Sequence, residues 1–502
     1  MVKTAADVTA LKFLGAILAL AGCGELADGQ SPDVETSTSA LVGGAVANPN
    51  GTSHVVTVDG TAIDQTNPFF QSLGTNGRAC VTCHEPTAGM TITPPQIQAL
   101  FNSTGGTDPL FRLFDGSVGP NAPVATLAQK QTAYSLLLSK GLIRIPLTLP
   151  ANRDFDVQVV LNPYASSGAN PAQNTVIAPT DTPQLSFYRR PLLSANTRFI
   201  STVMWDGREA TVSPVPTNPK GADGNGVQAF ETDAPVHINM MTQANDATLG
   251  HAQGTVNLTA AQEEAIVDFQ MNLVVAQETD NVVGALNLAG ATGGPQALRT
   301  QQTFYGINDP LGGNPFGTAF NPSAMTMFAA WAGLTGTDPV STRRASIARG
   351  EAIFNTKTIR ITGVRGVNDV VQGNLNATLN GTCTTCHSHP DVGNHSVSLP
   401  LDLGVADPAQ GGNVLPVFKV TCRATGVSTE VTDIGRAMIT GKCADLAKMK
   451  GPTLRALSAR APYFHNGSAN SLDDVITFYD TRFHIGFQAQ EIADLKAFLQ
   501  TL

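Results

Sequence analysis

The sequence predicts a mainly α-helical protein with two tandem domains, long loops and an insertion between the domains. Three observations lead to this prediction. The motif Cys-x-x-Cys-His occurs twice, at residues 80–84 and 383–387, and stretches with helical spacing of apolar residues flank the copies. Only 14% of the residues are charged, while 48 are glycine and 31 are proline, which is typical of a chain with many loops and short helices. A length of 502 residues suggests two or three domains at roughly 150 residues each.

Composition limits the classes of function. Apolar residues make up 42% of the chain, which is enough to form cores and excludes wholesale disorder. With 39 acidic and 30 basic side chains, the formal charge is −9. A nucleic-acid-binding protein needs a basic face for the phosphates, so we expect no nucleic-acid partner.

The N-terminus has the features of an export signal. Lys3 and Lys12 precede an apolar run over residues 13–22, which is too short to span a bilayer but matches the core of a signal peptide. The run ends in Leu-Ala-Gly-Cys, which resembles a bacterial lipobox. We therefore predict that residues 1–22 are removed and that Cys23 is lipidated, with ordinary cleavage nearby as the alternative.

The segment after this cysteine predicts where the protein resides. Residues 23–60 are taken as a lipidated N-terminus and flexible tether, because residues 24 to 53 are small and polar without periodicity. Gly24 after the lipidated cysteine favours the outer membrane. We expect an exported protein of the bacterial cell envelope, facing the periplasm or the cell surface, with only its lipid anchor in the membrane.

The two Cys-x-x-Cys-His motifs predict covalently bound haem. Two thiols three residues apart can each form a thioether with one haem vinyl group, and the next histidine then lies under the iron as its proximal ligand. A lone pair of cysteines could equally be a redox dithiol or half of a zinc site. The repetition, the histidine in both copies and the export signal favour two haem c groups. Their attachment residues are Cys80, Cys83, His84, Cys383, Cys386 and His387.

Helical patterns predict the structure around these motifs. Thr259 and Gln262 form a capping box at the start of one predicted helix. Residues 342–355 form another, in which Gly350 lets a second helix cross closely. Residues 488–502 have the apolar spacing expected of that partner.

These patterns divide the chain into two haem domains that look like small cytochrome c domains. The first domain is predicted at residues 61–280 and the second at residues 341–502. The insertion at residues 281–340 is rich in Gly, Asn and Pro and has few helix or strand patterns. It would serve as a lid, a dimer contact or a substrate surface, with decoration as the alternative. A homodimer therefore stays open.

Three further motifs follow the first haem motif. Trp-Asp-Gly-Arg occupies residues 205–208, and Lys-Gly-Pro-Thr-Leu-Arg occupies residues 450–455. Ala-Pro-Tyr-Phe-His-Asn-Gly-Ser follows at residues 461–468. Together with the two haem motifs, and in this order, they resemble the bacterial di-haem cytochrome c peroxidase family, which includes the MauG-type enzymes. The resemblance runs from about residue 75 to residue 502, apart from the insertion.

The resemblance implies roles around the first haem, which is the peroxidatic one in this family. Trp205 matches a tryptophan that assists electron transfer between the haems, with a core tryptophan as the alternative. On the distal side, Gln243 matches the family's glutamine, but Gln253 stands where a proton-moving glutamate is expected. His251 can act as the acid or base instead, or ligate the iron itself. A core or surface histidine is the alternative for His251, and Glu209 is a further candidate, although a solvated helix start is its usual interpretation.

The sixth ligand of the second haem departs from the family's peroxidases. Those enzymes have a methionine fourteen residues after the motif histidine, and counting from His465 reaches Tyr479. MauG-type members also have tyrosine there. Phenolate favours Fe(III) and higher oxidation states. Tyr479 is therefore the predicted ligand, with Met438 and Met449 as alternatives.

Calcium is a weaker implication of the resemblance. The family commonly holds this ion between the domains through backbone carbonyls and one asparagine. Arg460 and Pro462 match carbonyl positions, but Arg189 and Arg190 fall where the asparagine is expected and cannot ligate a cation. These two arginines could instead meet haem propionates.

Cys422 and Cys443 complete the seven cysteines. In an oxidising compartment a disulfide is the expected state, with two free thiols or a sulfur ligand as alternatives.

Three functions stay open. The first is reduction of hydrogen peroxide with electrons from an external donor, such as a small redox protein, through the second haem. The second is a MauG-type oxidase or oxygenase that uses hydrogen peroxide or dioxygen on a protein or organic substrate. The third is an electron-transfer or redox-sensing cytochrome without catalysis.

Overall fold

The computed structural model describes residues 44–200, 202–209, 234–301, 303, 307–310, 314, 316–387, 389, 392 and 400–502. The predicted signal peptide and Cys23 lie outside these residues. Within the part that is described, no helix is long and apolar enough to cross a bilayer. The described residues belong to one compact unit, and the division into haem domains stays a prediction.

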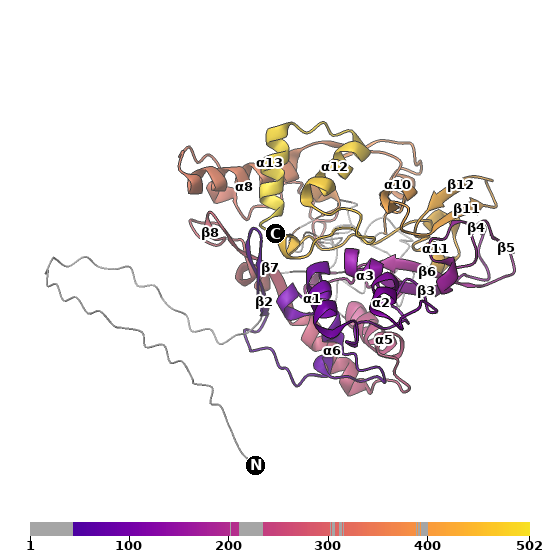
Figure 1. Cartoon of the computed structure of the whole chain (residues 1–502). Coiled ribbons are helices and arrows are strands. Elements are labelled where there is room, and N and C mark those ends of the chain that lie inside the picture. Colours follow the sequence, from indigo (N-terminus) through magenta and orange to yellow (C-terminus); the bar gives the residue numbers. More distant parts are fainter. Residues whose placement is uncertain are drawn as a thin grey trace, which may run out of the picture. The chain divides into compact units, whose positions relative to one another are not determined.

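Helices occur in both the earlier and the later parts of the chain (Figure 1). The earlier ones are α1 (Pro94–Thr104), α2 (Leu127–Ala133), α3 (Ser135–Lys140), α5 (Ala234–Gly250) and α6 (Ala260–Met271). The later ones are α7 (Pro295–Arg299), α8 (Pro339–Thr356), α9 (Asn368–Val371), α10 (Pro408–Gly411), α11 (Ala437–Thr440), α12 (Leu472–Phe483) and α13 (Ala489–Leu499). Thr259 caps α6 and forms the predicted capping box with Gln262.

The strands of the described residues form four antiparallel sheets. They are β1 (Ala45–Asn48), β2 (Gly51–Thr57), β3 (Ile143–Thr148), β4 (Phe155–Leu161), β5 (Val176–Ile177), β6 (Gln184–Arg189), β7 (Leu273–Asp280), β8 (Gly284–Ala285), β9 (Ile359–Ile361), β10 (Leu379–Gly381), β11 (Val417–Cys422) and β12 (Ser428–Val431). The sheets have the orders β1-β2-β7-β8, β12-β11-β4-β5, β10-β9 and β3-β6.

These sheets correct the prediction of a mainly α-helical fold, which is confirmed only in part. In β4, the buried Phe155, Val157 and Val159 alternate with the less buried Asp156 and Gln158, which is the pattern of a half-buried strand. Its partner β11 comes from the later part of the chain, where Cys422 pairs with Phe155. Such short strands form only with partners from distant parts of the chain. The sequence therefore indicates the helices more clearly than the strands.

The predicted close crossing of two helices is confirmed for α8 and α13, which lie side by side (Figure 1). A Cβ atom at Gly350 would overlap the main-chain carbonyl of Asp494 and lie 2.7 Å from the Cβ of Phe498. The crossing buries Ile347 and Phe354 of α8 against Phe498. Only glycine therefore allows the two helix axes to approach this closely.

The predicted insertion contributes to the core of the molecule. Phe328 and Trp331 are buried in the same apolar cluster as α8 and α13. The main-chain N–H of Phe328 donates to the Glu351 carboxylate at 3.1 and 3.2 Å, and Asn355 exchanges hydrogen bonds with the main chain of Met325. The described part of this segment is thus an integral component of the fold and more than a surface decoration.

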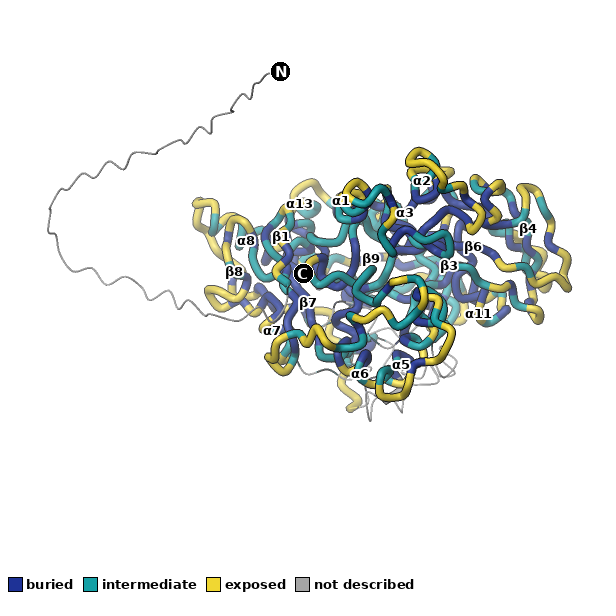
Figure 2. Tube along the Cα trace, turned by 60° about the horizontal axis from the view of Figure 1, so that its bottom comes forward, coloured by how far each residue is buried: buried dark blue, intermediate teal, exposed yellow. Residues whose placement is uncertain are grey.

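The predicted flexible tether extends too far along the chain. Its last residues include β1 and β2, and β2 pairs with β7 over residues 51–57 (Figure 2, where β7 is largely buried). The side chains of Val55 and Val56 are buried in this sheet. Burial of these valines orders the segment despite its small polar neighbours.

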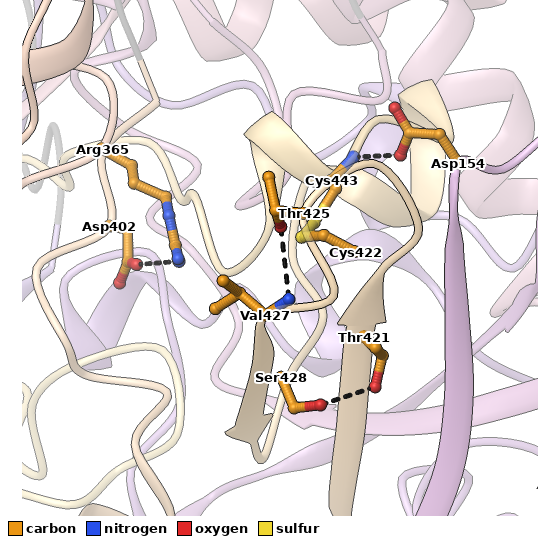
Figure 3. Close-up of a disulfide and its surroundings, with 9 residues drawn as sticks. All are labelled: Asp154, Arg365, Asp402, Thr421, Cys422, Thr425, Val427, Ser428 and Cys443. Atoms are coloured by element: carbon orange, nitrogen blue, oxygen red, sulfur yellow. Dashed lines mark hydrogen bonds and ion pairs between the residues drawn. A yellow bond between two sulfur atoms is a disulfide. The ribbon is translucent and has the colours of Figure 1, made fainter.

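A disulfide joins Cys422 at the end of β11 to Cys443, with the two Cα atoms 5.7 Å apart (Figure 3). The main-chain N–H of Cys443 donates to the Asp154 carboxylate at 2.5 Å. Asp154 directly precedes β4, so the disulfide and this hydrogen bond secure the same end of the paired inner strands β11 and β4.

Candidate functional site

The first haem motif lines a cavity. A 3₁₀ turn over Cys80–Thr82 brings the N–H of His84 to 3.1 Å from the carbonyl of Cys80, and this short turn directs both thiols and the imidazole toward the cavity. Both cysteines are unbonded. Burial raises the pKa of the Cys80 thiol to about 12 and that of the Cys83 thiol to about 11. A redox dithiol needs a lowered thiol pKa, so this environment does not suit one.

His84 presents one ring nitrogen to this cavity. Its Nδ1 lies 3.2 Å from the main-chain carbonyl of Met90, which leaves Nε2 for a ligand. Burial lowers the pKa of His84 to about 4, so the imidazole is neutral at physiological pH. Neutral imidazole is the form that coordinates a metal.

One face of α5 and the turn that follows it form another wall of this cavity. Gln243, Ala247 and His251 line the cavity and are spaced four residues apart, which places them on the same side of a helix. Gln253 is exposed and does not line it. The structure thus brings Gln243 and His251 together near His84 and leaves out the residue at the glutamate position.

His251 is held by a buried carboxylate. Its Nδ1 lies 2.6 Å from Oδ2 of Asp115, and the other oxygen of Asp115 lies 2.5 Å from Nη1 of Arg78. Burial alone would raise the pKa of Asp115, but the hydrogen bond with His251 and the charge of Arg78 outweigh burial and lower it. Asp115 is therefore an anion whose two oxygens both have partners.

The second haem motif lines a second cavity. Cys383, Cys386 and His387 lie on its wall, and both cysteines are unbonded. Burial raises the pKa of each thiol to about 12 and lowers the pKa of His387 to about 4. The buried Nδ1 of His387 has no hydrogen-bond partner among the described residues. This cavity is lined mainly by apolar side chains from α12, α13 and the adjoining loops.

Tyr479 of α12 and Met449 both line the second cavity. Burial and the neighbouring Cys386 and Cys383 raise the pKa of the Tyr479 phenol, and its hydroxyl has no hydrogen-bond partner in the described parts of the chain. A phenol in such a site loses its proton only beside a cation or a metal. Met438 instead packs in the core next to β4 and β11 and lines neither cavity. Ligation by Tyr479 stays a prediction.

Trp205 lines both cavities. Its indole N–H donates to the carbonyl of Arg190 at 2.8 Å, and its own carbonyl accepts from the N–H of Lys450 at 2.8 Å. The ring lies edge-on to His465, with the ring centroids 6.0 Å apart. The following residue, Asp206, is completely buried and forms an ion pair with Arg189 at 2.5 Å. These contacts fix the indole between the two cavities.

The residues of both cavities fit a covalently bound haem. Each cavity offers two neutral thiols and a neutral imidazole to a largely apolar space. Nε2 of His84 and the imidazole of His387 supply the nitrogen ligand that haem iron takes from a protein.

The chain is similar in sequence to cytochrome-c peroxidases. It is 30% identical over 132 residues to cytochrome-c peroxidase IdrP2 of Denitromonas iodatirespirans, covering 24% of this chain and 36% of that protein. It is 32% identical over 143 residues to cytochrome-c peroxidase IdrP1 of Pseudomonas sp. (strain SCT), with the same shares. It is 31% identical over 121 residues to the cytochrome c551 peroxidase of Nitrosomonas europaea, covering 24% and 30%. The chain thus spans about a third of the length of these curated relatives.

Two other comparisons complete this picture. A solved structure of a MauG-like protein associated with microbial copper homeostasis aligns with 62% of this chain and 75% of its own chain, at 18% identity and a TM-score of 0.26. No known family profile matches the chain. The similarity to the cytochrome-c peroxidases agrees with the family that the motifs resemble and with haem c as the cofactor.

The residues expected to hold calcium do not fit that ion. The guanidinium group of Arg190 donates to three main-chain carbonyls, those of Lys140 at 3.0 Å and of Ile92 and Arg460 at 3.2 Å. One of these is the Arg460 carbonyl that calcium would need. Arg190 is buried, and burial lowers its pKa to about 9, which still leaves it charged at neutral pH. A cation of the protein itself therefore occupies the carbonyl cluster.

Arg189 is not free to meet a haem propionate, which corrects that expectation. Its guanidinium group forms buried ion pairs with Asp206 at 2.5 Å and with Asp433 at 2.7 Å. Nε and Nη2 of Arg189 donate to Asp433, and Nη1 donates to Asp206. The resulting network fixes the backbone next to Trp205.

Two acidic residues differ from what the sequence predicts: Glu209 lies outside both cavities, and Asp115 belongs to the first. The Glu209 side chain is only 9% exposed, and burial raises its pKa to about 7, but it does not line either cavity. Asp115 was not predicted as a site residue, because it lies 136 residues before His251 in the chain. Nothing in the local sequence around Asp115 indicates this contact.

Proposed function

We propose that the protein is a di-haem c-type peroxidase, which reduces hydrogen peroxide with electrons from an external donor. The observation that carries the proposal is the pair of cavities, each lined by a Cys-x-x-Cys-His motif, with Trp205 on the wall of both. The similarity to cytochrome-c peroxidases supports it.

The residues that would hold the two haems follow from the two cavities. Cys80, Cys83 and His84 would hold the first, and Cys383, Cys386, His387 and Tyr479 the second. Bound haem supplies the redox-active iron at which the O–O bond of peroxide is broken.

The protein's own groups supply proton transfer, orientation and electron transfer. Gln243 would donate a hydrogen bond that orients the peroxide, and Nε2 of His251 would move a proton from one peroxide oxygen to the other. Trp205 carries electrons from the second cavity to the first. The whole reaction consumes H2O2, two electrons and two protons and yields two water molecules.

A MauG-type oxidase is the second candidate function. It is favoured by Tyr479 on the wall of the second cavity, because a phenolate ligand stabilises higher oxidation states of iron. Met449 on the same wall would favour the peroxidase, because a thioether ligand stabilises Fe(II). Absorption spectra of Tyr479→Phe and Met449→Leu variants decide between the two ligands, since only loss of the true ligand changes the spectrum of the second haem.

The peroxidase proposal is tested on the purified ferric holoprotein by EPR and absorption spectroscopy, before and after one equivalent of peroxide. We expect one high-spin haem that reacts and a second haem that is oxidised afterwards. Trp205→Phe should slow this second step on the order of tenfold or more, which corresponds to about 1.4 kcal/mol in activation free energy. Trp331→Phe is the matched control, because Trp331 is buried away from both cavities.

Two outcomes would contradict the proposal. If both haems are low-spin and do not change with peroxide, the protein is an electron-transfer cytochrome. If peroxide reacts but a reduced redox protein does not restore the ferric state, the oxidase is the better assignment.

We also propose that the chain is exported and anchored by a lipid on Cys23. The apolar run that ends at this residue supports the proposal. Cys23→Ser should move the protein from the membrane fraction to the soluble periplasmic fraction, and an unchanged distribution would refute the anchor.

A further inference from the structure

The contact between His251 and Asp115 is the shortest that His251 makes in the first cavity. Nδ1 of His251 lies 2.6 Å from Oδ2 of Asp115, and Asp115 is 1% exposed. His251 lines the cavity, and its Nε2 has no hydrogen-bond partner in the described residues. Of the two ring nitrogens, only Nε2 is therefore available to a molecule in the cavity.

Asp115 is itself held in place by Arg78. Nη1 of Arg78 lies 2.5 Å from Oδ1 of Asp115, while Nε and Nη2 of Arg78 donate to the carbonyls of Pro109 at 2.8 Å and Leu110 at 2.6 Å. The carboxylate consequently has one fixed orientation and a compensating charge. A buried carboxylate with both properties can hold an imidazole without moving itself.

The backbone of His251 is secured as well. Its carbonyl accepts from Nδ2 of Asn76 at 2.8 Å and from Nη1 of Arg78 at 3.2 Å. His251 follows directly after α5, and these bonds attach it to the segment that carries the first haem motif. Backbone and side chain are thus both anchored to the wall that bears His84.

From this geometry we infer that Asp115 is a positioning residue, which holds His251 as an imidazole–carboxylate pair with Nε2 directed into the first cavity. The carboxylate accepts the Nδ1–H, so the lone pair of the neutral imidazole resides on Nε2, and it stabilises the imidazolium after Nε2 has taken a proton. The inference rests on the proposed function, because it names the group that sets the proton acceptor of the peroxide reaction.

The charged and titratable groups around the pair come from several elements. Arg78 pairs with Asp115, the charge of Arg144 also acts on Asp115, and His84 lines the same cavity as His251. The other charged side chains on the cavity wall are Arg189, Arg190, Arg208, Lys450 and Arg460. A purely structural Asp115 would serve only as the partner of Arg78. In that case its loss would lower stability without changing proton transfer at His251.

The experiment compares Asp115→Asn, His251→Gln and the double variant with the wild-type holoprotein. The rate constants for reaction with peroxide and for association of cyanide are measured against pH. Hydrogen cyanide must lose its proton to bind ferric haem, so its association reports the same proton acceptor without turnover. We expect each single variant to slow both reactions by about 10²–10⁴-fold. The double variant should be no slower than His251→Gln alone, because the two residues act as a unit.

The rate constants separate a positioning role from a structural one. Asp115→Asn should slow both reactions even where the holoprotein is fully folded, because the Nδ1–H loses its acceptor and Nε2 is no longer directed into the cavity. Asp280→Asn is the matched control, since Asp280 is a buried carboxylate paired with Arg343 outside both cavities, and it should leave both rate constants unchanged. If Asp115→Asn does not fold, Asp115→Glu replaces it, with an intermediate fall expected.

Several results would overturn the inference. These are wild-type rates in Asp115→Asn, or a further fall when Asp115→Asn is added to His251→Gln. If the wild type does not react with peroxide, the proposed function fails by itself. Slower cyanide association in both variants would then still support the pair, and unchanged association would overturn it.

Discussion

At the scale of single residues, burial determines which groups of this molecule carry charge. The pKa of His84 and that of His387 are lowered to about 4 by burial, and the haem-motif thiols are kept neutral by the same cause. The buried carboxyl of Asp115 nevertheless stays ionised, because Arg78 and His251 compensate its burial, as Arg189 does for the buried Asp206. In the first cavity, His84 is thus neutral and Asp115 is an anion, which suits proton transfer at Nε2 of His251.

Glu351 provides a test of burial outside the two cavities. Burial raises its pKa to about 7, above its ordinary value of 4.5. The folded state therefore binds more protons than the unfolded state between these two values, so this residue's contribution to stability is complete below about pH 4.5 and is lost as the pH rises through about 7. Glu351→Gln keeps an oxygen for the N–H of Phe328 but cannot titrate.

We expect the wild type to lose more stability than Glu351→Gln when the pH is raised from 5 to 8. Melting temperatures of both proteins across this range check the prediction. Parallel curves would contradict it. Glu430, an exposed carboxylate on β12, offers the control substitution Glu430→Gln, which should leave the pH dependence unchanged.

How much of the site could be predicted depends on the distance between its residues in the sequence. The thiols and imidazole of each haem motif are adjacent in the chain, so the motif alone brings them together. Gln243 and His251 share one helix face and could be placed by counting. The ion pair of Arg189 with Asp433 joins residues 244 positions apart, and only the folded chain shows it.

At the scale of elements, the crossing of α8 and α13 depends on one missing side chain. A methyl group at Gly350 would overlap the carbonyl of Asp494, which is main chain and cannot turn away. Gly350→Ala should therefore force the helices apart and reduce the free energy of unfolding by about 1–3 kcal/mol, the usual cost of overpacking a core. Chemical denaturation of the holoprotein measures the loss.

The matched control is Gly250→Ala at the end of α5, where a Cβ atom would meet nothing within 4 Å. Alanine has the higher helix propensity, so this variant should be neutral or slightly more stable. Equal effects of the two substitutions would show that the crossing is not the cause.

Helices and strands differed in how far they could be predicted. The predicted helix over residues 342–355 agrees with α8, because Ile347, Gly350 and Phe354 repeat within the element itself. Strands β1 and β2 lie at the end of the predicted tether, and they form because β7 supplies hydrogen bonds and an apolar face. The spacing of apolar residues within the chain therefore predicts a helix such as α8. Strands such as β1 and β2 form only when the sheet is assembled, so local spacing does not predict them.

At the scale of the whole molecule, segments far apart in the sequence meet around Arg190. Its N–H donates to the carbonyl of His465 at 2.7 Å, and its carbonyl accepts from Trp205, so its backbone contacts the residues that lie between the two cavities. Its side chain joins the carbonyls of Ile92, Lys140 and Arg460. A single buried cation thus connects parts of the chain that carry both haem motifs.

This arrangement predicts that the protein does not depend on calcium. The wild-type holoprotein should contain no stoichiometric calcium by elemental analysis, and its melting temperature should be the same in calcium and in a chelator. Arg190→Met should lower the free energy of unfolding by several kcal/mol, because three buried carbonyls lose their donors at about 1–3 kcal/mol each. Lys496→Met is the control, since Lys496 forms an ion pair with Asp473 in which both side chains are exposed, and its loss should cost about 1 kcal/mol or less. A wild type that holds one calcium ion and melts earlier after chelation would contradict the prediction, because a calcium ion on the Arg460 carbonyl would be repelled by the charged guanidinium group of Arg190.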